Sequence, residues 1–232
     1  MKRQNRLLSS PSRPDRSPPA TSTGSPYTHR VSGRPRAPAP PHRGLLVVVS
    51  AGSGAGKSTL CRMLLKRRKN LVFSVSVTTR QPRPGEKEGK DYFFVTEAAF
   101  KAMRKRHELV EWARVHQDYY GTPRPFLERM RARGKDVLLD IDVQGARQVK
   151  KRFPEAVLIF ITTPTFGELE RRLRARSSET ESQIRQRLAD ARRELKYKGY
   201  YDYNVVNDRL PHALKRLEAI LDSESRKISN EK

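Results

Sequence analysis

Short apolar runs alternate with helix-spaced patterns along most of this chain. Four runs have the length and composition of buried parallel strands: 45–50, 137–142, 156–162 and 203–208. Between and after them, apolar residues recur at helical spacing and predict helices over 57–68, 123–133, 144–152, 165–175, 181–197 and 210–226. This alternation is typical of an α/β fold, in which helices cover both faces of a parallel sheet.

Residues 72–122 break the alternation. They contain "VFSVSVTT", "DYFFV" and "YYGT", separated by turns and by one helical stretch near 97–106. We interpret this part as a mixed, mainly β insertion with bounds of about 76–125.

The two ends of the chain differ in composition from the centre. Residues 1–43 are rich in Pro, Ser and Arg and sparse in apolar residues, which predicts a disordered tail, with a targeting segment as the alternative. Residues 223–232 are expected to form a second tail. The folded domain is therefore expected to span 44–222.

Charge and cysteine content narrow the class of protein. The formal net charge of +24 suggests polyanionic partners, but no nucleic-acid-binding motif is found and no specific nucleic acid is expected. No apolar run approaches the ~20 residues that would span a bilayer. The single cysteine, Cys61, cannot form an intramolecular disulfide, which fits a reducing compartment and a cytoplasmic protein.

The segment "SAGSGAGKSTL" lies between the first strand and the first helix. It fits the phosphate-binding P-loop pattern G-x-x-x-x-G-K-[ST], with Ala51 in the first glycine position. Its glycines let several backbone N–H groups face one anion, and the following helix adds its positive end. Lys57 is expected to reach the outer phosphates, and the Ser58 hydroxyl to bind Mg²⁺. The segment predicts a nucleoside triphosphate site formed by Ala51, Gly52, Ser53, Gly54, Ala55, Gly56, Lys57, Ser58 and Thr59.

A second group of polar residues could bind the acceptor. Arg80 and Arg83 flank a proline-stiffened turn, and two guanidinium groups at this spacing can clamp one phosphate. Glu111 lies downstream, and Asp140 and Asp142 follow an apolar strand, at the end where α/β proteins place their ligands. Each feature alone is ambiguous, because exposed arginines are usually solvated. Their joint order is what points to a site.

That order of motifs resembles the guanylate kinase family, whose members phosphorylate GMP with ATP. The resemblance covers residues 44 to about 222 and is carried by "SAGSGAGKST", "FSVSVTTRQPRPGEKEGKDYFFV", "LVEWA", "YYGT", "LDIDVQGA", "RRLRAR", "IRQRL" and "VVND". It implies a P-loop parallel-sheet core flanked by helices, a mixed, mainly β insertion that binds GMP, and a helical lid at about 168–190. It also implies ATP with Mg²⁺ as the phosphoryl donor, and GMP or dGMP as the acceptor.

The resemblance further implies roles for individual residues. The acceptor phosphate would be held by Arg80, Arg83, Tyr92 and Tyr120. The guanine would be contacted by Ser76, Glu111, Thr122 and Asp142. The catalytic residues, which stabilise charge on the transferring group, would be Lys57, Arg172, Arg176 and Arg187. Asn207 would lie beside the ATP adenine. Arginines and phenols suit phosphate, while carboxylates suit the N–H edge of guanine.

Local patterns in the predicted lid add two expectations. Arg172 and Arg176 stand at i and i+4, on one face of a helix. Ser178 and Glu181 could form a capping box for the next helix. One residue of the lid departs from the family pattern, because Ser177 stands where a glycine commonly follows the lid arginine. Likewise Gly52 stands where the family's loop often has a proline, which loosens that turn.

Three other functions stay open at this point. A P-loop kinase on the same scaffold could act on a phosphorylated sugar, although Glu111, Thr122 and Asp142 favour a purine base. A guanylate-kinase-like module could bind a partner without catalysis, although such a module need not keep Lys57 or the lid arginines. The basic tail could also bind nucleic acid.

Overall fold

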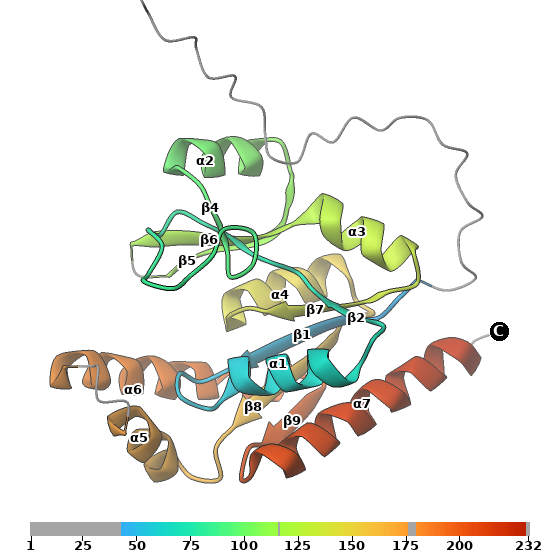
Figure 1. Ribbon diagram of the computed structural model, residues 1–232. Coiled ribbons are helices and arrows are strands. Elements are labelled where there is room, and N and C mark those ends of the chain that lie inside the picture. Colours follow the sequence, from blue (N-terminus) through green and yellow to red (C-terminus); the bar gives the residue numbers. More distant parts are fainter. Residues whose placement is uncertain (1–42, 116, 176–179, 231–232) are drawn as a thin grey trace, which may run out of the picture. The chain divides into compact units, whose positions relative to one another are not determined.

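The computed structural model of the chain describes residues 43–115, 117–175 and 180–230 (Figure 1). The predicted disordered tail lies outside these described residues except for Arg43. Within them, no helix combines the length and the hydropathy that a membrane span needs.

A five-stranded sheet forms the centre of the described domain. All its strands are parallel, and their order is β2 (Leu71–Phe73), β7 (Asp136–Asp140), β1 (Leu46–Ala51), β8 (Val157–Thr162) and β9 (Tyr203–Val206). β1 lies in the middle and its six residues are all buried. The near-continuous apolar runs arise because this sheet is covered on both faces.

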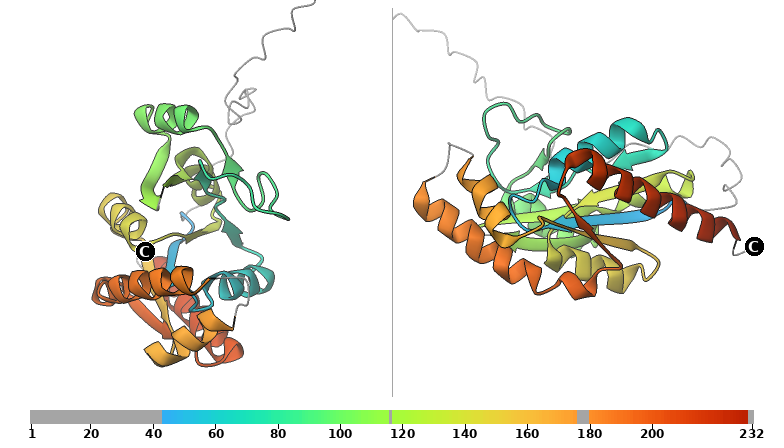
Figure 2. Two further views of the ribbon diagram at one scale, coloured as in Figure 1. Left: turned by 90° about the vertical axis from the view of Figure 1, so that its left-hand side faces the viewer. Right: turned by 90° about the horizontal axis from the view of Figure 1, so that it is seen from below.

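Side chains of β1 alternate between two apolar clusters, one on each face. Val47 and Val49 belong to the cluster that includes α1 (Lys57–Arg67) and α7 (Leu210–Asn230). Leu46 and Val48 belong to the cluster that includes α3 (Arg124–Ala132) and α4 (Val143–Arg152). Figures 1 and 2 show the helices on the two sides of the sheet. The predicted α/β fold class is confirmed.

A second, four-stranded sheet follows β2 in the chain. Its order is β4 (Phe93–Phe94), β3 (Val77–Thr78), β6 (Asp118–Pro123) and β5 (Leu109–Val115), with α2 (Glu97–Lys105) between β4 and β5. β3 pairs with β4 in parallel and with β6 antiparallel, so this sheet is mixed. β2 pairs with β7 of the central sheet, so the break in the α/β rhythm begins after Phe73 and not at residue 72.

The region of the predicted lid contains α5 (Phe166–Arg174) and α6 (Glu181–Leu195). The expected Ser178–Glu181 capping box is wrong: the Thr180 hydroxyl accepts from the Gln183 N–H, and the Gln183 side chain accepts from the Thr180 N–H. The described part of α5 ends at Arg174, so the expected shared helix face of Arg172 and Arg176 falls outside the described residues. Arg176 and Ser177 themselves lie outside the described residues.

The expected C-terminal tail at 223–232 is wrong as far as Asn230, because α7 continues through these residues. The extension is anchored in two places. Glu224 accepts a hydrogen bond from the Tyr203 hydroxyl, and Ile228 packs against the core cluster of α1 and α7. A short 3-10 turn, η1 (Lys198–Tyr200), joins α6 to β9.

Candidate active site

The loop between β1 and α1 is shaped by two glycines in the left-handed region. Gly54 and Gly56 have φ angles of +92° and +88°, and Gly56 is the N-cap residue of α1. A Cβ on Gly56 would lie 2.4 Å from the Asn207 side-chain nitrogen, so only glycine fits there. The loop lines a cavity of about 580 Å³. All nine residues predicted for the triphosphate site line it, together with Arg62 and Glu194.

Asp140 holds the two polar side chains at the start of α1. Its carboxylate lies 2.5 Å from the Lys57 ammonium and 3.4 Å from the Ser58 hydroxyl. Burial lowers the pKa of Lys57, but the Asp140 carboxylate outweighs it and raises the pKa above its ordinary value. Lys57 is therefore charged at neutral pH and points from the loop toward the end of β7.

A second cavity, of about 290 Å³, adjoins this point. It is lined by seven residues predicted from the sequence: Lys57, Ser58, Ser76, Tyr92, Glu111, Tyr120 and Asp142. Asp140, Ala113, Val115 and Ile141 complete the lining. Lys57 and Ser58 thus line both cavities. The strands of the second sheet supply one side of this cavity, and the carboxyl end of β7 supplies the other.

Glu111 lies in this second cavity as a buried acid. Its side chain accepts a hydrogen bond of 2.6 Å from the Thr122 hydroxyl, so Thr122 positions the acid and does not itself line the cavity. Burial raises the pKa of Glu111 to about 7, although the Thr122 hydrogen bond lowers it; the nearby Asp142 carboxylate raises it further.

Gly145, in the first turn of α4, has no side chain, and the Glu111 carboxylate occupies the space beside it. A Cβ on Gly145 would lie 2.4 Å from Glu111 Oε2. The Gly145 N–H also donates a 2.8 Å hydrogen bond to Asp142, the N-cap residue of α4. One residue of this helix therefore positions both carboxylates.

The predicted phosphate-binding arginines lie on the loop between β3 and β4. The Arg80 guanidinium donates to both oxygens of Glu86, at 2.7 and 2.9 Å, and its Cζ lies 5.4 Å from the centre of the Tyr92 ring. Glu86 also accepts from the Arg83 N–H at 2.8 Å, while the Arg83 side chain is exposed. Tyr92 and Tyr120 meet edge to face. Neither arginine lines the second cavity in this structure.

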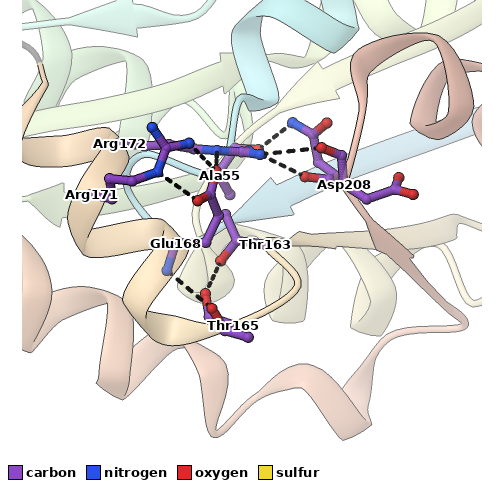
Figure 3. A network of polar contacts seen from close by, with 8 residues as sticks. Ala55, Thr163, Thr165, Glu168, Arg171, Arg172 and Asp208 are labelled. Atoms are coloured by element: carbon purple, nitrogen blue, oxygen red, sulfur yellow. Dashed lines mark hydrogen bonds and ion pairs between the residues drawn. The ribbon is translucent and has the colours of Figure 1, made fainter.

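The lid arginines have different surroundings. Arg172 donates to Glu168 at 2.7 Å and to the Asn207 carbonyl at 3.0 Å, in the network shown in Figure 3. Arg187 is half-buried on α6. The third predicted lid arginine, at position 176, is not among the described residues.

Asn207 supports the phosphate loop through a hydrogen bond to its backbone. Its side chain is buried, with 2% of the residue exposed, and its amide donates to the Ala55 carbonyl at 2.8 Å. It lines neither of the two cavities described above, and its proximity to the ATP adenine stays a prediction. Its contacts make it a support for the loop.

Three residues of the site are absent from the sequence-based assignment. Glu86 closes the arginine turn, Gly145 makes room for Glu111, and Glu194 lines the phosphate-loop cavity. A signal existed for Glu194, because this acid follows Ala191 by three residues, beside the buried stripe of α6.

Comparison with known proteins agrees with this geometry. The family model described as guanylate kinase matches residues 43–224. A guanylate kinase from Caldanaerobacter subterraneus subsp. tengcongensis is 45% identical over 190 residues, which are 82% of this chain and 92% of the relative. One from Synechococcus sp. (strain JA-3-3Ab) is 46% identical over 203 residues, 87% and 94% of the two chains.

A solved structure gives the same answer. The crystal structure of guanylate kinase from Anaplasma phagocytophilum matches with a TM-score of 0.66 at 37% identity, covering 79% of this chain and 87% of that chain. Sequence and structural similarity both extend over nearly all of the described residues. The chain therefore belongs to the guanylate kinase family.

Proposed function

We propose that the protein transfers the terminal phosphoryl group of ATP to GMP, giving ADP and GDP, and so acts in purine nucleotide metabolism. The observation that carries this proposal is the pair of cavities that meet at Lys57 and Ser58. A phosphate bound in either cavity reaches the same two side chains, which is the arrangement that transfer between two nucleotides requires.

The donor cavity suits a triphosphate. The loop supplies backbone N–H groups and the positive end of α1, and Lys57 supplies a charge that Asp140 keeps in place. The described residues contain no cluster of three or more His, Cys, Asp or Glu that could bind a metal by itself. Mg²⁺ in kinases is held by few protein groups and by the substrate phosphates, so Ser58, backed by Asp140, fits that ion. Bound there, Mg²⁺ would neutralise negative charge on the donor phosphates.

The acceptor cavity suits guanine. The Glu111 carboxylate, once ionised, accepts hydrogen bonds from the N1–H and the 2-amino group of guanine. Adenine offers an acceptor at N1 and no 2-amino group, and would leave a buried carboxylate unpaired. Sites built to bond a substrate donor reject the analogue that lacks it by about 10⁴-fold. Ser76 and Asp142 line the same cavity and complete the proposed base contacts.

Catalysis then requires that the two phosphates be positioned and that positive charge stabilise the transferring group; it requires no proton transfer by a side chain. The GMP phosphate is itself an anionic nucleophile, so no dedicated general base is required. Arg80, Arg83, Tyr92 and Tyr120 are proposed to hold that phosphate in line with the donor. In the structure Arg80 is paired with Glu86, so binding the phosphate requires Arg80 to share or leave that contact.

The lid is proposed to supply the remaining charge. Arg172, Arg176 and Arg187 would stabilise the transferring group once the lid closes, and closure would exclude water. For Arg172 this means leaving Glu168 and the Asn207 carbonyl. A cytoplasmic location remains a prediction from the sequence.

A coupled assay of ADP formation tests the function, with GMP, dGMP, AMP and ribose 5-phosphate each offered as the only acceptor. We expect turnover with GMP and dGMP and a kcat/KM for AMP lower by about 10⁴-fold. A partner-binding module without catalysis would form no ADP with any acceptor, and a sugar kinase would prefer ribose 5-phosphate.

The Glu111→Gln variant then tests which residue reads the base. It places an amide donor opposite the guanine donors, so we expect kcat/KM for GMP to fall more than that for AMP. An unchanged GMP/AMP ratio would remove Glu111 from base recognition.

A further inference from the structure

Glu194 brings an acid into the cavity that is proposed to bind the triphosphate. It lies on α6, three residues after Ala191, and α6 packs against the loop. A Cβ on Gly52 would lie 3.4 Å from Ala191 Cβ and 3.9 Å from Glu194 Oε2. The Oε2 atom is buried and has no hydrogen-bond partner among the residues that the structure describes. A buried, unpartnered carboxylate oxygen beside an anion site requires an explanation.

The groups around Glu194 do not neutralise it fully. Lys57 is the cation of the loop, but it is already paired with Asp140 at 2.5 Å. Asp142, at the start of α4, and Asp190, on α6, place further negative charge near the carboxyl group.

Three other titratable groups come from the elements around Glu194. The phenol of Tyr201, which follows η1, interacts electrostatically with Glu194. Arg62 lines the cavity from α1. Arg187 lies two helical turns before Glu194 on the same face of α6, and it has an interaction of its own.

These surroundings make the carboxyl group easy to protonate. Burial raises the pKa of Glu194 to about 7 and outweighs Lys57, which lowers it; Asp142 and Asp190 raise it, and a backbone hydrogen bond from Ser53 lowers it. Both forms of the acid are therefore present near neutral pH. A bound triphosphate adds several negative charges to the same cavity and favours the neutral form.

We propose that Glu194 takes up one proton from solvent when the donor triphosphate binds, and enters the complex as a neutral carboxylic acid whose O–H donates to a phosphate oxygen. Oε2, which is unpartnered within the described part of the chain, is the atom that would carry this proton. The proposal rests on the proposed donor site. It makes Glu194 a further residue that binds the donor, and it couples ATP binding to pH.

The coupling has a defined size and sign. A carboxyl group with a pKa of about 7 is about 90% ionised at pH 8, so ATP binding at this pH should take up ~0.9 proton. Because the ionised form must first be protonated, the Kd for ATP should rise with pH, about fivefold between pH 7 and pH 8. A carboxylate that only caps the Ser53 N–H would stay ionised and would give neither effect.

Isothermal titration calorimetry with the full chain tests this at pH 8. ATP is titrated without GMP, in Tris, HEPES and tricine, whose ionisation enthalpies differ, and the slope of the binding enthalpy against buffer enthalpy gives the proton number. Mg²⁺ in excess keeps the nucleotide itself unprotonated. We expect a slope of ~0.9 for the parent chain and near zero for Glu194→Gln.

Glu111→Gln is the matched control, because Glu111 is also a buried acid with a pKa raised to about 7 but lies in the acceptor cavity. It should keep the parent's slope. A parent slope near zero overturns the proposal without any variant, even if Glu194→Gln fails to fold. A slope that persists in a folded Glu194→Gln protein also overturns it. If ATP gives no binding heat at all, the donor site itself is refuted, and with it the proposed function.

Discussion

Adding one methyl group at Gly145 should disable base recognition without unfolding the protein. In the structure, a Cβ at this position lies 2.4 Å from Glu111 Oε2 and 3.0 Å from its Cδ. Ordinary van der Waals contact begins near 3.4 Å, so the carboxylate must move by about 1 Å. Thr122 donates a 2.6 Å hydrogen bond to the other oxygen of this carboxylate, so the shift also lengthens or bends that hydrogen bond.

The size of the effect follows from that displacement. A misplacement of about 1 Å in a positioned group can lower the rate about 10²-fold. We therefore expect Gly145→Ala to lower kcat/KM for GMP by about 10²-fold and to leave the Kd for ATP unchanged. Alanine is also favoured over glycine within a helix by about 1 kcal/mol, which offsets part of the strain. The melting temperature should therefore change little.

The assay compares kcat/KM for GMP with the ATP Kd and the melting temperature of the same preparation. Gly199→Ala is the control, because it adds the same methyl group where, apart from its own chain neighbours, no atom of the described residues lies within 4 Å. If Gly145→Ala retains GMP activity within twofold of the parent chain, Glu111 either tolerates the shift or does not read the base.

Three further predictions concern charge, pH and the loop. Lys57→Ala should lower kcat by at least about 10²-fold, or ~3 kcal/mol, in the coupled assay, since it removes the charge shared by both cavities; parent-like turnover would contradict this. Because the pKa of Glu111 is about 7 and guanine needs its ionised form, the KM for GMP should rise about fourfold from pH 8 to pH 6.5, and Glu111→Gln should lose that share of the pH dependence. Gly52→Ala should raise the free energy of unfolding by ~0.4–1 kcal/mol, because its Cβ meets only ordinary contacts. Gly56→Ala, at φ +88°, should lower it by more than ~1 kcal/mol; equal denaturation midpoints for the two variants would refute the loop geometry.

Features that depend on residues adjacent in the sequence could be predicted from the sequence. The triphosphate loop is one continuous segment, so its nine residues and the flanking strand and helix follow from local chemistry. The family resemblance predicts the acceptor residues, and most of them line the second cavity. By contrast, the contact between Glu111 and Gly145 joins residues 34 positions apart in the chain, and their spacing carries no sign of it.

Where two residues or segments have equivalent local chemistry, the tertiary packing determines which one takes the structural role. Ser178 and Thr180 both have the hydroxyl that a helix cap needs, and α6 uses Thr180. The segment 223–230 is mostly polar and looks like a tail. Its one large apolar residue, Ile228, packs against the core and extends α7. Glu194 lies beside the apolar stripe of α6 in the sequence, but only the placement of the loop beside α6 shows that it lines the cavity.

The four-stranded sheet that carries the acceptor side has a small core of its own. Val77, Phe100, Met103 and Leu109 are buried there but belong to neither cluster that flanks the central sheet. Regions with fewer apolar contacts open at lower free energy than the main core. Backbone amides of this sheet should therefore exchange with solvent before those of β1. A molecule with this sheet opened would still bind ATP at the loop but would no longer discriminate between guanine and adenine. On warming, the selectivity for GMP over AMP should therefore decrease before the affinity for ATP does.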